Sequence, residues 1–172
     1  MSEIDWNREL LQAAEHGDVA RLQNALKHQA VVDARDDMGA TALIRAADYN
    51  EVECLKILIK AGADVDAQDR KGQSGLIWAA DCGHQESLDI IIAAGAKLDL
   101  VTEVGFSALS KAAMHHHMGC VESLIVAGAD TSCLASHHQE EYADMLEARA
   151  KREKLARQRQ GQQNLRRFSR RP

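Results

Sequence analysis

Four histidine and cysteine side chains have a spacing that could bind zinc. Two residues separate His117 from Cys120, and three separate Cys133 from His137. Structural zinc sites take four nitrogen and sulfur ligands, which short pairs of this kind commonly supply. The four residues are therefore a candidate metal site, provided that the elements carrying them can bring all four together.

Other chemistry finds less support in the sequence. No phosphate-binding loop, nucleophile elbow, zinc-protease motif or dinucleotide-binding turn occurs. The many carboxylates fall mainly where turns and helix caps favour aspartate, as at Asp36, Asp64, Asp69 and Asp130. The cysteines are sparse and form no CxxC pair, so a disulfide framework is not expected. We therefore expect no catalytic residue, no cofactor and no enzymatic activity.

Composition favours a helical protein with two differently charged parts. Apolar residues make up 45% of the 172 and aromatic residues only 3%, as in Ala- and Leu-rich helical chains. Residues 147–172 hold 10 of the 21 Lys and Arg but only 2 of the 26 Asp and Glu, which leaves +8 on this tail and −13 on residues 1–146. The acidic start of the chain is unlike a secretory signal, and no apolar run approaches about 18 residues. These features predict a cytoplasmic protein without a membrane span.

Three marks recur every 33 residues along most of the chain. They are a glycine (Gly39, Gly72, Gly105), an alanine pair (Ala46-Ala47, Ala79-Ala80, Ala112-Ala113) and a Gly-Ala pair (Gly62-Ala63, Gly95-Ala96, Gly128-Ala129). Chance does not keep three separate marks in register over three copies. A period of this length indicates a solenoid whose unit is one supersecondary motif.

Each unit is expected to contain two helices. Hydroxyl residues stand where they can cap the first helix, at Thr41, Ser74 and Ser107. A break follows at Asn50, Gly83 and His116, although histidine adopts the left-handed conformation less readily than glycine or asparagine. The second helix carries apolar residues at spacings of three and four, which put them on one face. These are Leu55, Leu58, Ile59, Leu88, Ile91, Ile92, Val121, Leu124 and Ile125.

The unit resembles the repeat of the ankyrin family. TALIRAA, SGLIWAA and SALSKAA stand where the family has TPLHxAA, and GADVDA, GAKLDL and GADTSC stand where it has GADVNA. The resemblance covers about residues 6–146. Two family residues are missing: the proline is replaced by Ala42, Gly75 and Ala108, and the first histidine by Ile44, Ile77 and Ser110. Without the hydrogen bond of that histidine, we expect a less rigid stack than a consensus array.

The resemblance implies an all-α ankyrin solenoid of helix-turn-helix units with hairpin-like loops. Its expected parts are an N-terminal capping repeat (1–35), three central repeats (36–68, 69–101 and 102–134), a C-terminal capping and projecting basic helix (135–160) and a disordered basic tail (161–172). The register also weakens the zinc hypothesis. His117 aligns with His84 at the start of a second helix, and Cys120 aligns with Cys54 and Ser87 at a small position between helices. A rigid helix would keep the four candidate ligands apart, so we favour structural roles for them.

In an ankyrin stack the loop tips and the exposed side of the first helices form a concave groove, so the resemblance implies a protein partner there. The candidate partner-binding residues are Met38, Arg45, Tyr49, Arg70, Lys71, Trp78, Asp81, Phe106, Lys111, Met114 and His115. Several are large and apolar where stacking does not require it, and aromatic residues and arginine dominate interface hot spots. For Trp78, packing against the neighbouring repeat is an equal alternative. The histidine run 115–117 lies between two helices and could respond to mild acid.

We therefore predict a non-catalytic protein-interaction module, an adaptor or an inhibitor or immunity partner that is monomeric by itself. One alternative is an exported effector that uses the basic tail, and another is the zinc site. The tail could instead be a solubilising helix, or could bind an acidic partner or nucleic acid through its ten cations. Its sole aromatic residue, Phe168, gives base stacking little support.

Overall fold

The computed structural model describes residues 4–134, 142, 147–148 and 151. The chain divides into two compact units, Met1–Leu134 and Ala135–Pro172. The helix expected over 135–160 and the tail expected over 161–172 lie outside the described residues, apart from residues 142, 147–148 and 151.

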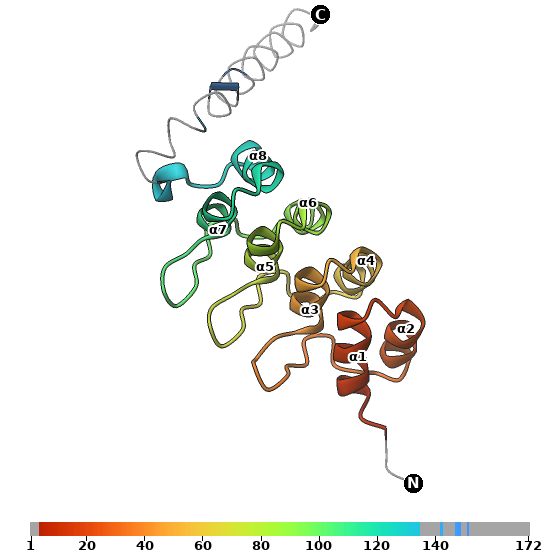
Figure 1. Ribbon diagram of the computed structural model, residues 1–172. Coiled ribbons are helices and arrows are strands. Elements are labelled where there is room, and N and C mark those ends of the chain that lie inside the picture. Colours follow the sequence, from red (N-terminus) through yellow and green to blue (C-terminus); the bar gives the residue numbers. More distant parts are fainter. Residues whose placement is uncertain (1–3, 135–141, 143–146, 149–150, 152–172) are drawn as a thin grey trace, which may run out of the picture. The chain divides into compact units, whose positions relative to one another are not determined.

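The first unit is a stack of helix pairs. The pairs are α1 (Trp6–Glu15) with α2 (Val19–Lys27), α3 (Ala42–Asp48) with α4 (Val52–Lys60), α5 (Gly75–Cys82) with α6 (Gln85–Ala93), and α7 (Ala108–Met114) with α8 (Met118–Ala127). A 3-10 turn, Thr131–Cys133, follows. In Figure 1 the odd-numbered helices form one row and the even-numbered helices a second, and three loops extend from the first row. The expected all-α solenoid is confirmed.

Each of these loops closes on itself through one antiparallel bridge. The bridges pair Arg35 with Thr41, Gln68 with Ser74 and Val101 with Ser107. We call residues 35–41, 68–74 and 101–107 the first, second and third hairpin loops. Each ends on the hydroxyl residue that begins the next helix, so the loop and the helix are fixed together.

The predicted hydroxyl caps are confirmed. Thr41 Oγ1 accepts a hydrogen bond from the Ile44 amide at 3.4 Å, and Ser74 and Ser107 do the same for the amides three residues on, at 3.3 Å each. Such a bond satisfies one of the amides that a helix N-terminus leaves without a partner. The helix starts are therefore encoded locally in every copy.

The predicted breaks between paired helices lie in the left-handed region. The backbone φ is 58° at Asn50, 73° at Gly83 and 55° at His116. Glycine adopts this conformation freely, asparagine tolerates it, and histidine does so with strain because its Cβ crowds the following carbonyl. The third repeat thus makes the same turn with a less suitable residue.

Small residues let neighbouring repeats approach closely. The alanine pairs of the first helices are fully buried or nearly so. A Cβ atom on Gly75 would lie 2.8 Å from Leu43 Cδ2, so the missing side chain admits α5 against α3. The aligned residues Cys54, Ser87 and Cys120 are also buried, as their expected place between helices requires.

A regular row of polar bonds joins the repeats where the second helices end. The carboxylates of Asp33, Asp66 and Asp99 each accept a hydrogen bond from a backbone amide 31 residues later, at 2.8–3.0 Å. The donors are the amides of Asp64, Lys97 and Asp130. These aspartates thus satisfy an exposed main-chain donor and fix the spacing between repeats.

The strained turn at His116 yields a stability prediction. His116→Gly should raise the free energy of unfolding by up to about 1 kcal/mol, because glycine removes the Cβ clash at φ 55° and Gly83 already makes this turn. Urea unfolding followed by circular dichroism measures the change. The matched control is His115→Gly, where φ is −97° and glycine brings no relief, so stability should fall. Equal destabilisation by both variants would contradict the argument.

Candidate functional site

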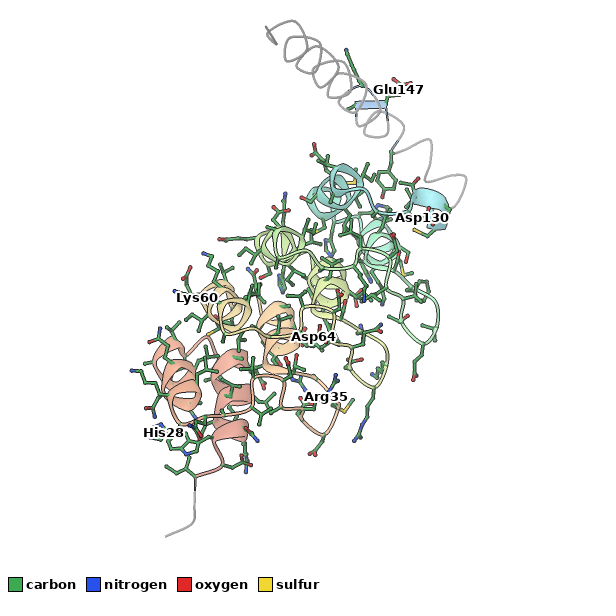
Figure 2. The ribbon with its side chains drawn as sticks, turned by 180° about the vertical axis from the view of Figure 1, so that it is seen from behind. His28, Arg35, Lys60, Asp64, Asp130 and Glu147 are labelled. Atoms are coloured by element: carbon green, nitrogen blue, oxygen red, sulfur yellow. The ribbon has the colours of Figure 1, made fainter. Side chains whose placement is uncertain are left out.

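The hairpin loops and the exposed sides of α1, α3, α5 and α7 make up one continuous side of the first unit, which we call the loop–helix face. Figure 2 marks it at Arg35, whereas Lys60 lies on the side of the second helices. Two clefts hollow this face. The first cleft, about 740 Å³, lies between α1 and the first hairpin loop, and the second, about 250 Å³, lies between the second and third hairpin loops.

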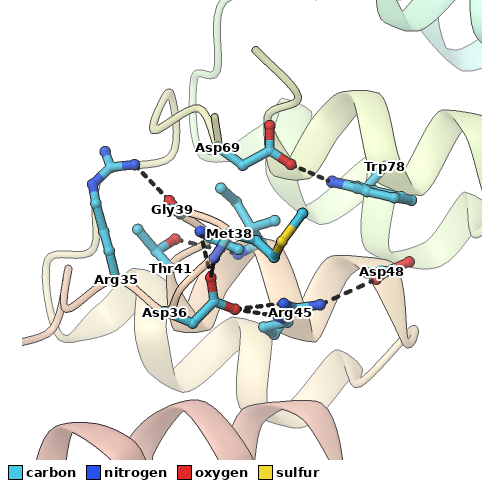
Figure 3. Close-up of polar contacts among 11 residues, drawn as sticks. Arg35, Asp36, Met38, Gly39, Thr41, Arg45, Asp48, Asp69 and Trp78 are labelled. Carbon is cyan, nitrogen blue, oxygen red and sulfur yellow. Dashed lines mark hydrogen bonds and ion pairs between the residues drawn. The ribbon is translucent and has the colours of Figure 1, made fainter. Parts of the chain in front are cut away.

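A half-buried aspartate, Asp36, organises the first hairpin loop. Asp36 Oδ1 accepts hydrogen bonds from the amides of Met38 and Ala40 at 2.8 and 2.9 Å, and its Oδ2 accepts one from Arg45 Nε at 2.8 Å (Figure 3). Burial alone would raise the pKa of Asp36, but the bonds from Arg45 and the two amides together outweigh it and lower the pKa. Arg45, a predicted partner contact, therefore has a structural task as well.

In the second repeat an aspartate again binds two amides of its own loop, but a tryptophan takes the place of the arginine. Asp69 Oδ1 accepts hydrogen bonds from the amides of Lys71 and Gln73. Asp69 Oδ2 accepts one from Trp78 Nε1 at 3.3 Å (Figure 3). Trp78 is half-buried and takes the position of Arg45 one repeat later. Its indole therefore supports its own loop, while part of the ring stays on the surface.

Four of the predicted residues meet in one cluster that spans two repeats. Asp81 of α5 lies 3.3 Å from Lys111 Nζ and 3.0 Å from His115 Nε2, both in the following repeat. Lys111 Nζ also lies 5.5 Å from the centre of the Phe106 ring, within reach of a cation–π contact. The charged groups of the cluster therefore pair with one another, and the His115 side chain stays about half exposed.

The remaining predicted residues are separate from that cluster and face solvent. Met38, Tyr49 and Met114 are between 45% and 50% exposed, and Arg70 and Lys71 are exposed at the second loop tip. Tyr49 has an acidic neighbour, because the charge of Glu15 raises the pKa of its hydroxyl. The candidate partner-binding residues thus fall into two groups: some stabilise the loop–helix face through bonds within it, and the others are exposed to solvent on its surface.

His117, one of the two histidines in the candidate zinc set, links two repeats. His117 Nε2 lies 3.0 Å from the Asp81 carbonyl oxygen, and His84 Nε2 lies 2.9 Å from that of Asp48. A carbonyl only accepts, so each ring donates through its Nε2 hydrogen. Sequence reasoning missed these bonds, although the 33-residue spacing of the two histidines was the available signal.

The two cysteines of the candidate zinc set, Cys120 and Cys133, also lie in surroundings that do not favour metal binding. Burial raises the pKa of Cys120 to about 11, with a smaller contribution from Asp89, so the metal-binding thiolate is disfavoured. Cys133 Sγ lies 3.4 Å from the Asp130 carbonyl oxygen. No three metal-ligating side chains gather among the described residues, and His137 lies outside them.

Comparison with known proteins identifies the class. A family model for ankyrin repeats, in three copies, matches residues 6–69. The same caps, turns and links between repeats continue at the 33-residue spacing beyond that match, and together they support an ankyrin-repeat protein. None of the curated proteins with which it was compared matches it.

The match to ankyrin repeats indicates a general class of function. Ankyrin repeats are generally protein–protein interaction modules, and the family is typically non-catalytic. In the part of the chain that the structure describes, no helix has the length and apolar character needed to cross a bilayer.

The Asp36 network predicts acid-dependent stability. Asp36→Asn should lower the free energy of unfolding at neutral pH by about 1–2 kcal/mol, because it removes the charged acceptor of Arg45. Since the folded-state pKa of Asp36 lies below its ordinary 3.8, the wild-type advantage is complete well above 3.8 and disappears as the pH falls through the lowered pKa. Unfolding curves at several pH values measure this. The exposed neighbour provides the control, Asp37→Asn, whose effect should be small. An advantage that grows on acidification would refute the assignment.

The two readings of His117 also predict different outcomes. If the ring links repeats, His117→Ala should lower stability by about 1–2 kcal/mol with or without a chelator. His117→Gln, which keeps a donor, should lose less. Thermal unfolding with added zinc chloride or with chelator gives the comparison. A zinc-dependent rise in the wild-type melting temperature that His117→Ala abolishes would restore the metal site.

Proposed function

We propose that this protein binds a partner protein through its loop–helix face and catalyses no reaction, acting as an adaptor or an inhibitor. The observation that carries the proposal is the set of large apolar side chains exposed there. Met38, Tyr49 and Met114 are about half exposed, and Val104 at the third loop tip is 77% exposed. Large apolar side chains exposed on one side of the stack support a binding role for that side.

The opposite side of the stack differs in character. Among the described residues, α2, α4 and α6 carry no large exposed apolar side chain, and only Met118 and Val126 of α8 do so. A cleft of about 540 Å³ between α4 and α6 is lined by Lys56, Gln85, Glu86, Asp89, Ile90 and Ala93, of which Ile90 is only half-exposed. The apolar asymmetry therefore favours the loop–helix face for a protein partner.

The loops are held before any partner arrives. Asp36 and Asp69 each bind their own loop through two backbone amides and one side chain of the following helix. A preformed surface loses little conformational entropy on binding, which favours affinity. Rigid loops with variable tips suit a binding module that recognises one partner.

The proposal also includes a cytoplasmic location and a role for the basic tail. The four cysteines are free thiols, which suits a reducing cytoplasm. The basic residues 147–172 lie almost wholly outside the described residues, so export and nucleic-acid binding through that tail stay predictions.

The proposal is tested by comparing two sets of substitutions. Met38→Ala, Tyr49→Ala and Met114→Ala combined should weaken partner capture by about tenfold or more, because they remove the exposed apolar surface. The measurement is quantitative affinity capture from the native cell, with circular dichroism to verify the fold. Met118→Ala with Val126→Ala is the matched control on the second-helix side and should leave capture unchanged. Capture that survives the triple variant, or is lost with the control, would sink the proposal.

A further inference from the structure

The three hairpin loops form a row joined by backbone hydrogen bonds. The Arg70 amide of the second loop donates to the Met38 carbonyl oxygen of the first at 3.0 Å. The Glu103 amide of the third loop donates to the Lys71 carbonyl oxygen of the second, also at 3.0 Å. Each loop thus binds the edge of the loop before it, as strands do in a sheet.

In the first hairpin loop one backbone amide, that of Asp37, forms no hydrogen bond with another described residue. Asp37 stands 33 residues before Arg70, so its amide is the counterpart of the two donors, but among the described residues no hairpin loop precedes it. Within the described part of the chain, no acceptor is bonded to the Asp37 amide, and the residue is exposed. A free backbone donor at an edge is a template for pairing with another extended segment.

The first cleft lies along this edge. Its walls come from α1 and from the first hairpin loop with the residues before it. Leu11, Val31 and Ala34 give it an apolar part, and Val31 is 59% exposed. At about 740 Å³ the cleft has room for several residues of a peptide.

The charges that line the first cleft are unbalanced toward negative. Arg45 is paired with Asp36, and Arg35 donates to the carbonyl oxygens of Gly39 and Gln68. The lining carries four carboxylates, Asp5, Glu15, Asp36 and Asp37, against three arginines, Arg8, Arg35 and Arg45, which gives a formal net charge of −1. Asp5, Glu15 and Asp37 form no ion pair with another described residue. The cleft therefore suits a cationic side chain better than an anionic one.

We propose that the first cleft binds an extended segment of a partner protein that carries lysine or arginine next to an aliphatic residue. A backbone carbonyl oxygen of the segment accepts the Asp37 amide hydrogen, as Met38 and Lys71 accept those of the following loops. Its cation lies among the cleft carboxylates, and its aliphatic side chain covers Val31. Edge pairing of this type gains affinity from main-chain bonds and specificity from alternate side chains.

The test uses two matched peptides and the full chain. Acetyl-VKVKV-amide and acetyl-VEVEV-amide are titrated to about 2 mM into isotope-labelled protein, and backbone amide resonances are followed by NMR. The lysine peptide should move the Asp37 amide downfield, slow its hydrogen exchange and shift Val31, while the glutamate peptide should leave all three unchanged. Glu15→Gln with Asp37→Asn should weaken the lysine peptide about fivefold, and the control Glu103→Gln should not.

Several results would overturn the inference. They are the absence of any shift at Asp37, equal shifts with both peptides, and lysine-peptide binding that the double variant does not weaken. An Asp37 shift on raising the protein concentration alone would assign the edge to a second copy of this chain, which is also contrary to the proposal. Failure here would leave partner capture by Met38, Tyr49 and Met114 unaffected, so the two proposals fail separately.

Discussion

The structure depends on hydrogen bonds that run from a side chain of one repeat to the backbone of the next. A helix pair of this size cannot bury its apolar face alone, so the stack exists only if neighbours meet at a fixed spacing. The aspartates at 33, 66 and 99 capture an amide of the following repeat, and the histidines at 84 and 117 capture a carbonyl oxygen of the preceding one. These bonds satisfy main-chain groups that would otherwise lose their partners at the junction.

The positions of the hairpin loops on the loop–helix face follow from that spacing. Arg35 reaches forward to the Gln68 carbonyl oxygen, and Gln68 reaches in turn to that of Val101. Because the base of each loop is fixed, the side chains at the loop tips are not needed for packing. Methionine, lysine and valine can therefore occupy equivalent tip positions, at 38, 71 and 104, without disturbing the stack. The same division explains how one fold accommodates many partners: affinity and specificity lie in residues that stability does not constrain.

The sequence was sufficient for the fold because its information is periodic. The hydroxyl caps, the left-handed breaks and the alanine pairs recur every 33 residues, and each acts through local backbone chemistry that needs no tertiary context. The roles of Arg45 and Trp78 were harder to see, since a cation and an indole share one position and both bind an aspartate nine residues earlier. That spacing was visible, but the shared acceptor became evident only once the loop had folded back on its helix. The repeat register was a better guide than the zinc-like spacing: His117 and Cys120 are close in sequence, yet one lies at a junction between repeats and the other in the interior.

The ends of a solenoid obey different rules from its middle. An internal repeat has each edge covered by a neighbour, so its donors and acceptors are paired by construction. At the first loop the Asp37 amide has no preceding hairpin loop to bind within the described part of the chain, and at the third loop Val101 stands where Arg35 and Gln68 send their side chains forward. Valine has no donor, so this chain of side-chain links cannot continue past the third repeat. The interior of the stack thus sets stability, whereas its first edge offers the backbone chemistry with which a further segment could extend it.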